Sequence, residues 1–171
     1  MTPFGPIRAI IIALQGGSDP KHVAAGFALG AALGLVPKDN LFPVLFLLLF
    51  FFMRVDKNMA IFSAFLFTPV GYALDGFAHA LGGALLSASA LRPLWTALYD
   101  LPIVPLTLFN NTVVLGNLVL GLLLFYPLYA SFIGVVVAYR ARYKERVDRW
   151  PIVKFVKGLS WYQTYQRWLG P

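Results

Sequence analysis

The chain of 171 residues is 59% hydrophobic and only 12% charged, with a mean hydropathy of +0.73. Soluble domains usually carry about 25% charged residues, and a domain of this size cannot bury so much apolar surface within itself. The composition therefore excludes an ordinary soluble fold and predicts an all-α integral membrane protein. The chain has no Cys, which excludes disulfides, cysteine metal sites and thiol catalysis, and its two histidines, His22 and His79, do not make a metal site.

The net charge of +7 lies mostly in residues 140–171, where eight basic and two acidic residues give +6. An excess of Lys and Arg is typical of the cytoplasmic segments of membrane proteins, so we expect residues 140–171 to form a basic, amphipathic cytoplasmic tail. Four side chains are expected to anchor this tail at the membrane surface: Lys154, Lys157, Trp161 and Trp168. The alternative is that these side chains of the tail dock to a partner protein instead of the membrane. Nucleic-acid binding is not expected, because the tail directly follows a membrane helix and is rich in aromatic residues.

Two segments outside the central region are predicted to be membrane-associated helices. Residues 1–17 are expected to contain an interfacial helix, because Ile7, Ile10, Ile11 and Leu14 share one helical face. Residues 112–138 form the one uncharged run with the length of about 20 apolar residues that a full crossing needs. Pro127 lies inside this run, and lipid-embedded helices tolerate proline when neighbouring helices satisfy the freed carbonyl.

The membrane domain, residues 18–139, also contains apolar runs that are too short for simple crossings. Residues 20–53 and 59–91 are interrupted by proline-bearing breaks at Pro37–Asn40 and at Thr68–Pro69. This pattern predicts two re-entrant helical hairpins together with one or two full transmembrane helices, of which the closing helix, residues 112–138, is one. Short helices joined by interfacial loops are the alternative. Transporters use such broken helices to build sites within the membrane. The proline-rich segment 92–111 is predicted to be a distorted crossing or a loop at the far interface.

Charge predicts the orientation of these elements. If the tail is cytoplasmic, the last crossing places residues 110–111 outside. Two re-entrant hairpins then leave Lys21, Arg54, Lys57 and Arg92 on the cytoplasmic side, in agreement with the positive-inside rule.

Small and amide-bearing residues mark the predicted packing faces. Gly26, Gly30 and Gly34 recur every four residues, which lets another helix approach closely. Three asparagines are expected to hydrogen-bond between helices: Asn110, Asn111 and Asn117.

The segment Ser18–Gly34, SDPKHVAAGFALGAALG, resembles a bacterial family known as "domain of unknown function 2062". Its signature is A-x-G-F-A-L-G, followed by a glycine and a proline-bearing break, and the similarity extends over residues 18–145. Family members often have Gly and Gln after the first proline, where this chain has Lys38–Asn40, and Asn-Pro at the second break, where it has Thr68–Pro69. The chain therefore resembles a short, distinct subfamily. The resemblance implies a bacterial inner-membrane protein and no particular activity.

Six polar residues are candidates for an intramembrane site: Lys38, Asp39, Asn40, Thr68, Asp75 and His79. Ionisable groups within a membrane are costly and usually functional. The first three lie at the tip of the first predicted hairpin, where the end of a half-helix offers carbonyls to a cation or to Lys38. Asp75 and His79 share a helical face and can relay a proton or bind a headgroup. The alternative for Lys38–Asn40 is a solvated turn, and the alternative for Asp75 and His79 is an internal hydrogen bond.

The sequence contains no nucleophile elbow, P-loop or dinucleotide fingerprint, so we expect neither an enzyme nor a bound cofactor. The leading hypothesis is a transport-associated role for a small solute, an ion or a lipid. The alternative is a non-catalytic accessory or scaffold subunit of an envelope lipid-transport or assembly complex. The expected partners are the lipid bilayer, a second copy of the chain, and an envelope protein, for which the resemblance suggests an AsmA-like one.

Overall fold

The computed structural model describes Leu14 and residues 18–143, and the regular elements in this part of the chain are all helical. The α-helices are α2 (Pro20–Leu35), α3 (Phe42–Phe52), α4 (Lys57–Ser87), α5 (Arg92–Tyr99) and α6 (Thr112–Ala138). Single 3₁₀ turns at Ser89–Leu91 and Val104–Thr107 flank α5, and a π-helical turn at Tyr139–Tyr143 continues α6. The all-α fold is thus confirmed. The predicted interfacial helix and the anchoring residues Lys154, Lys157, Trp161 and Trp168 lie outside the described residues.

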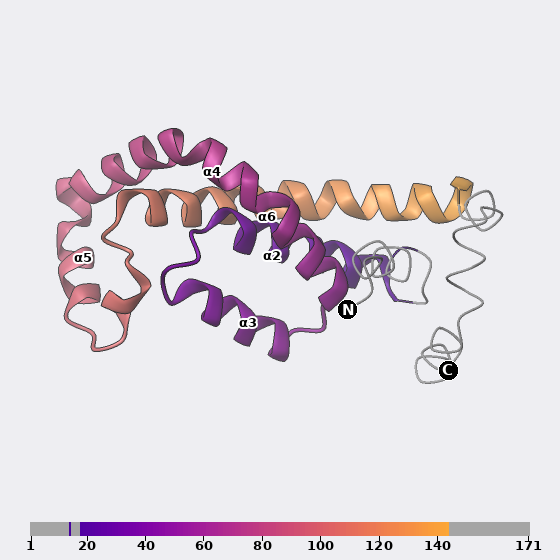
Figure 1. The fold of residues 1–171 in the computed structure, drawn as a ribbon, viewed down its shortest axis with the longest axis horizontal. Helices are drawn as coiled ribbons and strands as arrows, with labels where there is room; N and C mark the ends of the chain where they lie inside the picture. The colour runs from indigo at the N-terminus through magenta and orange to yellow at the C-terminus, as the bar shows by residue number, and fades with distance from the viewer. Residues whose placement is uncertain (1–13, 15–17, 144–171) are drawn as a thin grey trace.

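The closing helix has the predicted bounds, whereas the second predicted hairpin is wrong. α4 is one helix of 31 residues that runs through Thr68 and Pro69 without a turn. Pro69 removes one backbone donor, and the Thr68 hydroxyl donates a hydrogen bond to the carbonyl of Ala64 at 2.7 Å; both features bend helices. α4 is visibly arched (Figure 1), and it continues as one helix through the position where a break was expected. Arg92 consequently lies beyond the opposite end of α4 from Lys57.

Helix α2 lies at the centre of the fold, between α4 and α6 (Figure 1). Twelve of its sixteen residues are buried. Gly26 contacts Asp56 and Gly34 contacts Ala64, so α2 and α4 run parallel. On α6, Gly116 contacts Ala78 of α4, and the order of such contacts makes α6 antiparallel to both.

Backbone meets backbone where these three helices touch. A β-carbon at Gly30 would lie 2.0 Å from the carbonyl oxygen of Ala60, and one at Gly116 would lie 1.9 Å from that of Ala78. Gly26 and Gly34 make similar approaches to α4, so the predicted glycine stripe forms the α2–α4 contact. Only glycine leaves room for such an approach, which gains close van der Waals packing.

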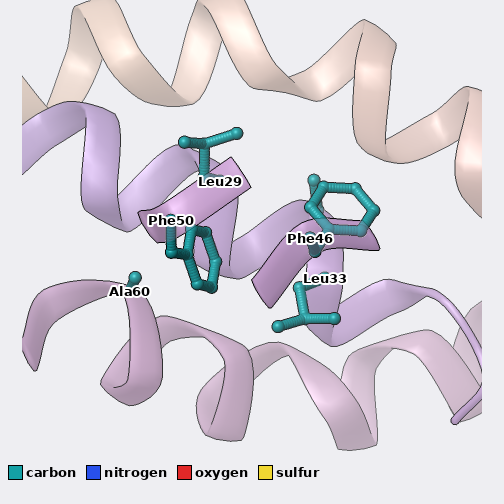
Figure 2. Close-up of a cluster of buried hydrophobic side chains, with 6 residues drawn as sticks. Leu29, Leu33, Phe46, Phe50 and Ala60 are labelled. Carbon is teal, nitrogen blue, oxygen red and sulfur yellow. The ribbon is translucent and has the colours of Figure 1, made fainter. Parts of the chain in front are cut away.

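Helix α3 folds back along α2 and completes a helical hairpin over the first half of the membrane domain. Phe46 and Phe50 pack one turn apart against Leu29 and Leu33 of α2, beside Ala60 of α4 (Figure 2). The backbone N–H of Asp56 donates to the carbonyl of His22 at 3.0 Å, which brings the two ends of the hairpin together. The rest of α3 points outward, and Phe51 and Phe52 are 82% and 85% exposed.

Two helices are long and apolar enough to cross a membrane: α4, and α6 with its continuation to Arg142. In the most apolar 18-residue window of each, only 17% and 11% of the residues are buried inside the protein. A core helix of a soluble protein would be mostly buried. The apolar faces of both helices therefore lack cover from the described part of the chain.

The start of α6 supplies a prediction about stability. The side chain of Asn111 accepts hydrogen bonds from the backbone N–H groups of Val113 at 2.9 Å and Val114 at 3.3 Å. Replacing an N-cap asparagine by alanine typically costs about 1 kcal/mol. We expect Asn111→Ala to lower the free energy of unfolding in detergent by about that amount. Asn110→Ala, which changes an exposed neighbour, is the control, and equal stability of the two variants would contradict the assignment of the cap.

Candidate functional site

A polar pair, Asn117 and Asp75, joins α4 to α6 near the point where α2 ends. Asn117 of α6 is 0% exposed, and its Nδ2 donates to Oδ1 of Asp75 on α4 at 3.0 Å. Asn117 thus makes the kind of interhelical hydrogen bond that its place in an apolar helix suggests. Asp75 is half-buried, because its other side faces a small cavity.

This cavity, called the polar cavity below, lies between the C-terminal end of α2 and the middle of α4. Its lining comprises Gly34, Leu35, Val36, Pro37, Lys38, Thr68, Tyr72 and Asp75. Its volume of about 10 Å³ is close to the least that one water molecule needs. The polar cavity has room for a water molecule or a small ion but not for an organic solute.

Lys38 closes the end of α2. Its ammonium group donates hydrogen bonds to the carbonyl oxygens of Leu33 at 2.6 Å and Gly34 at 3.0 Å, and to that of Val36. A cation at this position complements the negative end of the helix dipole. The Lys38 side chain therefore satisfies the last carbonyls of α2 and places a positive charge beside the polar cavity.

The structure brings together three of the six candidate residues. Lys38, Thr68 and Asp75 line the polar cavity, whereas Asp39, Asn40 and His79 do not. Asn40 instead shapes the turn into α3: its Nδ2 donates to the carbonyl of Pro37 at 2.8 Å, and its Oδ1 accepts from the N–H of Phe42 at 2.9 Å.

The remaining two candidates point elsewhere. Nδ1 of His79 is hydrogen-bonded to Oγ1 of Thr112 at 2.7 Å, with donor and acceptor set by the histidine tautomer. Asp39 is exposed, and within the described residues its carboxylate makes no hydrogen bond or ion pair. His79 thus ties α4 to the start of α6 and does not share the cavity with Asp75.

Tyr72 is the lining residue with a polar side-chain group that the sequence analysis missed. Thr68, Tyr72, Asp75 and His79 recur at intervals of four, three and four residues, which is the spacing of a single helical face. The assumed break at Thr68–Pro69 concealed this pattern. Reading residues 57–87 as one helix would have placed Tyr72 beside Asp75.

The polar cavity and its polar pair offer mainly oxygen acceptors. Oδ1 of Asn117 is buried without a hydrogen-bond partner among the described residues, and the Asp75 carboxylate provides further acceptor positions. Buried polar atoms without partners are rare and call for an explanation. A small cation is the kind of occupant that such acceptors suit. No cluster of three His, Cys, Asp or Glu side chains suited to a metal ion occurs among residues 18–143.

Comparisons with known proteins agree with the resemblance seen in Ser18–Gly34. A family described as "Uncharacterized protein conserved in bacteria (DUF2062)" matches residues 8–145. An uncharacterized protein of Treponema pallidum (strain Nichols) is 35% identical over 127 residues, which cover 74% of this chain and 78% of that protein. No solved structure matches the chain. The chain therefore belongs to this uncharacterized family of bacterial proteins, DUF2062.

Proposed function

We propose that the chain is a multi-pass protein of the bacterial inner membrane in which α4 and α6 cross the bilayer. The support is the length of these helices, their apolar composition and the small part of their surface that the protein itself covers. α3 adds a further exposed apolar face. In water these faces would be an aggregation hazard, whereas in a bilayer they contact acyl chains.

The charges favour a cytoplasmic location for the end of the molecule where α2 and α4 begin. Five basic residues lie at this end, because they belong to or adjoin the starts of α2 and α4 and the end of α6, where Arg140 donates to the carbonyl of Ser18: Lys21, Arg54, Lys57, Arg140 and Arg142. The segment beyond the opposite end of α4 carries only Arg92 and Asp100 between residues 88 and 111. This asymmetry fits the positive-inside rule and is consistent with a cytoplasmic C-terminal tail.

The hairpin of α2 and α3 then enters from the cytoplasmic side and turns near the outer surface of the membrane. α3 has 11 residues, which is too short for a crossing of about 20 residues. At 1.5 Å per residue, the part of α4 from Lys57 to Asp75 is about 27 Å long. The hydrocarbon core is about 30 Å thick, so the polar cavity lies toward the outer side of the membrane.

We infer that the protein has a transport-associated role, in which the polar cavity handles a proton or a small cation. The observation that carries this proposal is the Asp75–Asn117 pair, which places a carboxylate and an unpartnered amide oxygen between two candidate spans. Intramembrane carboxylates are costly to keep and characteristically mark ion or proton pathways. The small volume of the cavity favours ions over solutes or lipids as the substrate class.

The test is ion flux through the purified protein in liposomes, with a pH-sensitive dye inside and an imposed proton, Na⁺ or K⁺ gradient. We expect flux above that of empty liposomes and its loss in Asp75→Asn. Asp39→Asn is the matched control, because it removes the same charge from an exposed side chain outside the cavity. Absence of flux in the wild type, or equal flux in both variants, would refute this role.

The second candidate function is an accessory or scaffold subunit of an envelope complex. The observation that favours it is the close backbone packing of α2, α4 and α6, which leaves little freedom for the helix movements of a transporter. This role predicts a stoichiometric partner that stays bound when the membrane is extracted into native lipid discs. An envelope protein that co-purifies, together with no flux in liposomes, would favour the scaffold role.

A further inference from the structure

A second and larger pocket opens at the other end of the molecule, away from the polar cavity. It has a volume of about 510 Å³, within the range of small-molecule sites. Its lining residues come from the start of α2 and from the connection between α3 and α4: Ser18, His22, Arg54, Val55, Asp56, Lys57 and Asn58. Two basic side chains and a histidine thus share one concave surface.

The basic groups of this pocket are available to a ligand. Within the described residues, the side chains of Arg54 and His22 make no hydrogen bond or ion pair, and both are exposed. The ammonium of Lys57 lies 5.1 Å from the centre of the Phe51 ring, a contact that leaves its donors free. The one carboxylate of the lining belongs to Asp56, which is already used as the N-cap of α4 and accepts from the N–H of Met59 at 2.9 Å.

The surroundings of the pocket also favour a negative ligand. α2 and α4 run parallel and both begin here, so the positive ends of two helix dipoles are added to the charges of Arg54 and Lys57. Arg and Lys donors bind phosphate oxygens through charge-assisted hydrogen bonds. The pocket therefore suits a phosphate group.

The apolar surface beside the pocket indicates the source of that phosphate. Arg54 follows directly on the exposed end of α3, where Phe51, Phe52 and Met53 are uncovered. We propose that the pocket binds the phosphate of an anionic phospholipid, whose acyl chains lie along the outer face of α3. This site is distinct from the polar cavity and does not depend on an ion-transport role.

The test is the binding of short-chain phosphatidylglycerol to the full chain in detergent, measured by native mass spectrometry and by titration. We expect the double variant Arg54→Gln/Lys57→Gln to bind at least about tenfold more weakly, since two charge-assisted hydrogen bonds are lost. Lys21→Gln/Arg142→Gln is the matched control. It removes the same charge from exposed side chains at the same end of the molecule but outside the pocket, and we expect it to bind as the wild type does.

Two outcomes would overturn the proposal. Equal weakening in both double variants would mean that the lipid responds only to the overall charge of this end. Inorganic phosphate that binds as tightly as phosphatidylglycerol would mean that the pocket takes a free anion and that α3 contributes nothing. Both variants change exposed side chains, and circular dichroism will verify that they remain helical before binding is compared.

Discussion

Replacing Gly30 by alanine is expected to separate α2 from α4 and to cause a large loss of stability. The new β-carbon would lie 2.0 Å from the carbonyl oxygen of Ala60 and 2.1 Å from Oγ of Ser63. The carbonyl belongs to a helix backbone, so no change of rotamer relieves that overlap. Overpacking of cores typically costs about 1–3 kcal/mol and occasionally more, and we expect Gly30→Ala to reach or exceed the upper part of this range.

Thermal unfolding in detergent, followed by circular dichroism, measures this effect. Gly76→Ala and Gly134→Ala are the controls, because a β-carbon at either position meets no atom within 4 Å. Alanine is about 1 kcal/mol better than glycine within a helix, so both controls are expected to match or exceed the stability of the wild type. If Gly30→Ala behaved like these controls, the close contact of α2 with α4 would be disproved.

The second large effect is expected from Asn117→Asp, which places a second carboxylate against Asp75. In the wild type, Nδ2 of Asn117 lies 3.0 Å from Oδ1 of Asp75, and Asn117 is fully buried. Two carboxylates at this separation cannot both remain charged, so the folded variant must hold a proton that the unfolded chain releases at neutral pH. Its stability is therefore greatest at low pH and falls as the pH rises above about 4, by up to about 1.4 kcal/mol per pH unit.

Denaturant unfolding of Asn117→Asp between pH 5 and pH 8, compared with the wild type, tests this result. The exchanged variant Asp75→Asn/Asn117→Asp keeps one carboxylate and one amide, and we expect it to recover most of the stability lost at pH 8. A variant Asn117→Asp as stable as the wild type at pH 8 would show that the two side chains do not meet in the folded protein.

Much of the fold could be predicted because its signals are local. The uncharged run of residues 112–138 fixes the bounds of α6, and Asp19 with Pro20 marks the start of α2. The continuity of α4 could not be predicted in the same way. Pro69 is a helix breaker by local rules, and what outweighs it is packing between distant segments, such as the contacts of Gly71 with Leu35 and of Gly82 with Thr112.

The candidate site was predictable in its polar residues but not in its geometry. Lys38, Thr68 and Asp75 stand out as polar groups in apolar segments, yet the sequence cannot show that α2 ends at the level of Asp75. The glycine stripe indicates that some helix approaches α2 closely, but it does not identify α4 or the parallel direction. The second pocket could not be predicted, because His22 of α2 and the segment from Arg54 to Lys57 lie far apart in the sequence and only the folded hairpin brings them together.

The measurement that tests the membrane placement most directly is labelling of single cysteines with a membrane-impermeant maleimide. The protein has no cysteine, so each introduced one reports on a single position, and reaction requires a thiolate, which forms in water. Phe65→Cys on α4, Leu48→Cys on α3 and Leu123→Cys on α6 replace exposed apolar side chains, and Asp39→Cys reports on the tip of the hairpin. In intact membranes we expect Asp39→Cys to react and the other three to stay unlabelled until the lipid is removed. Equal labelling of all four positions would mean that these helices face water, and would contradict the placement of α4 and α6 across the bilayer.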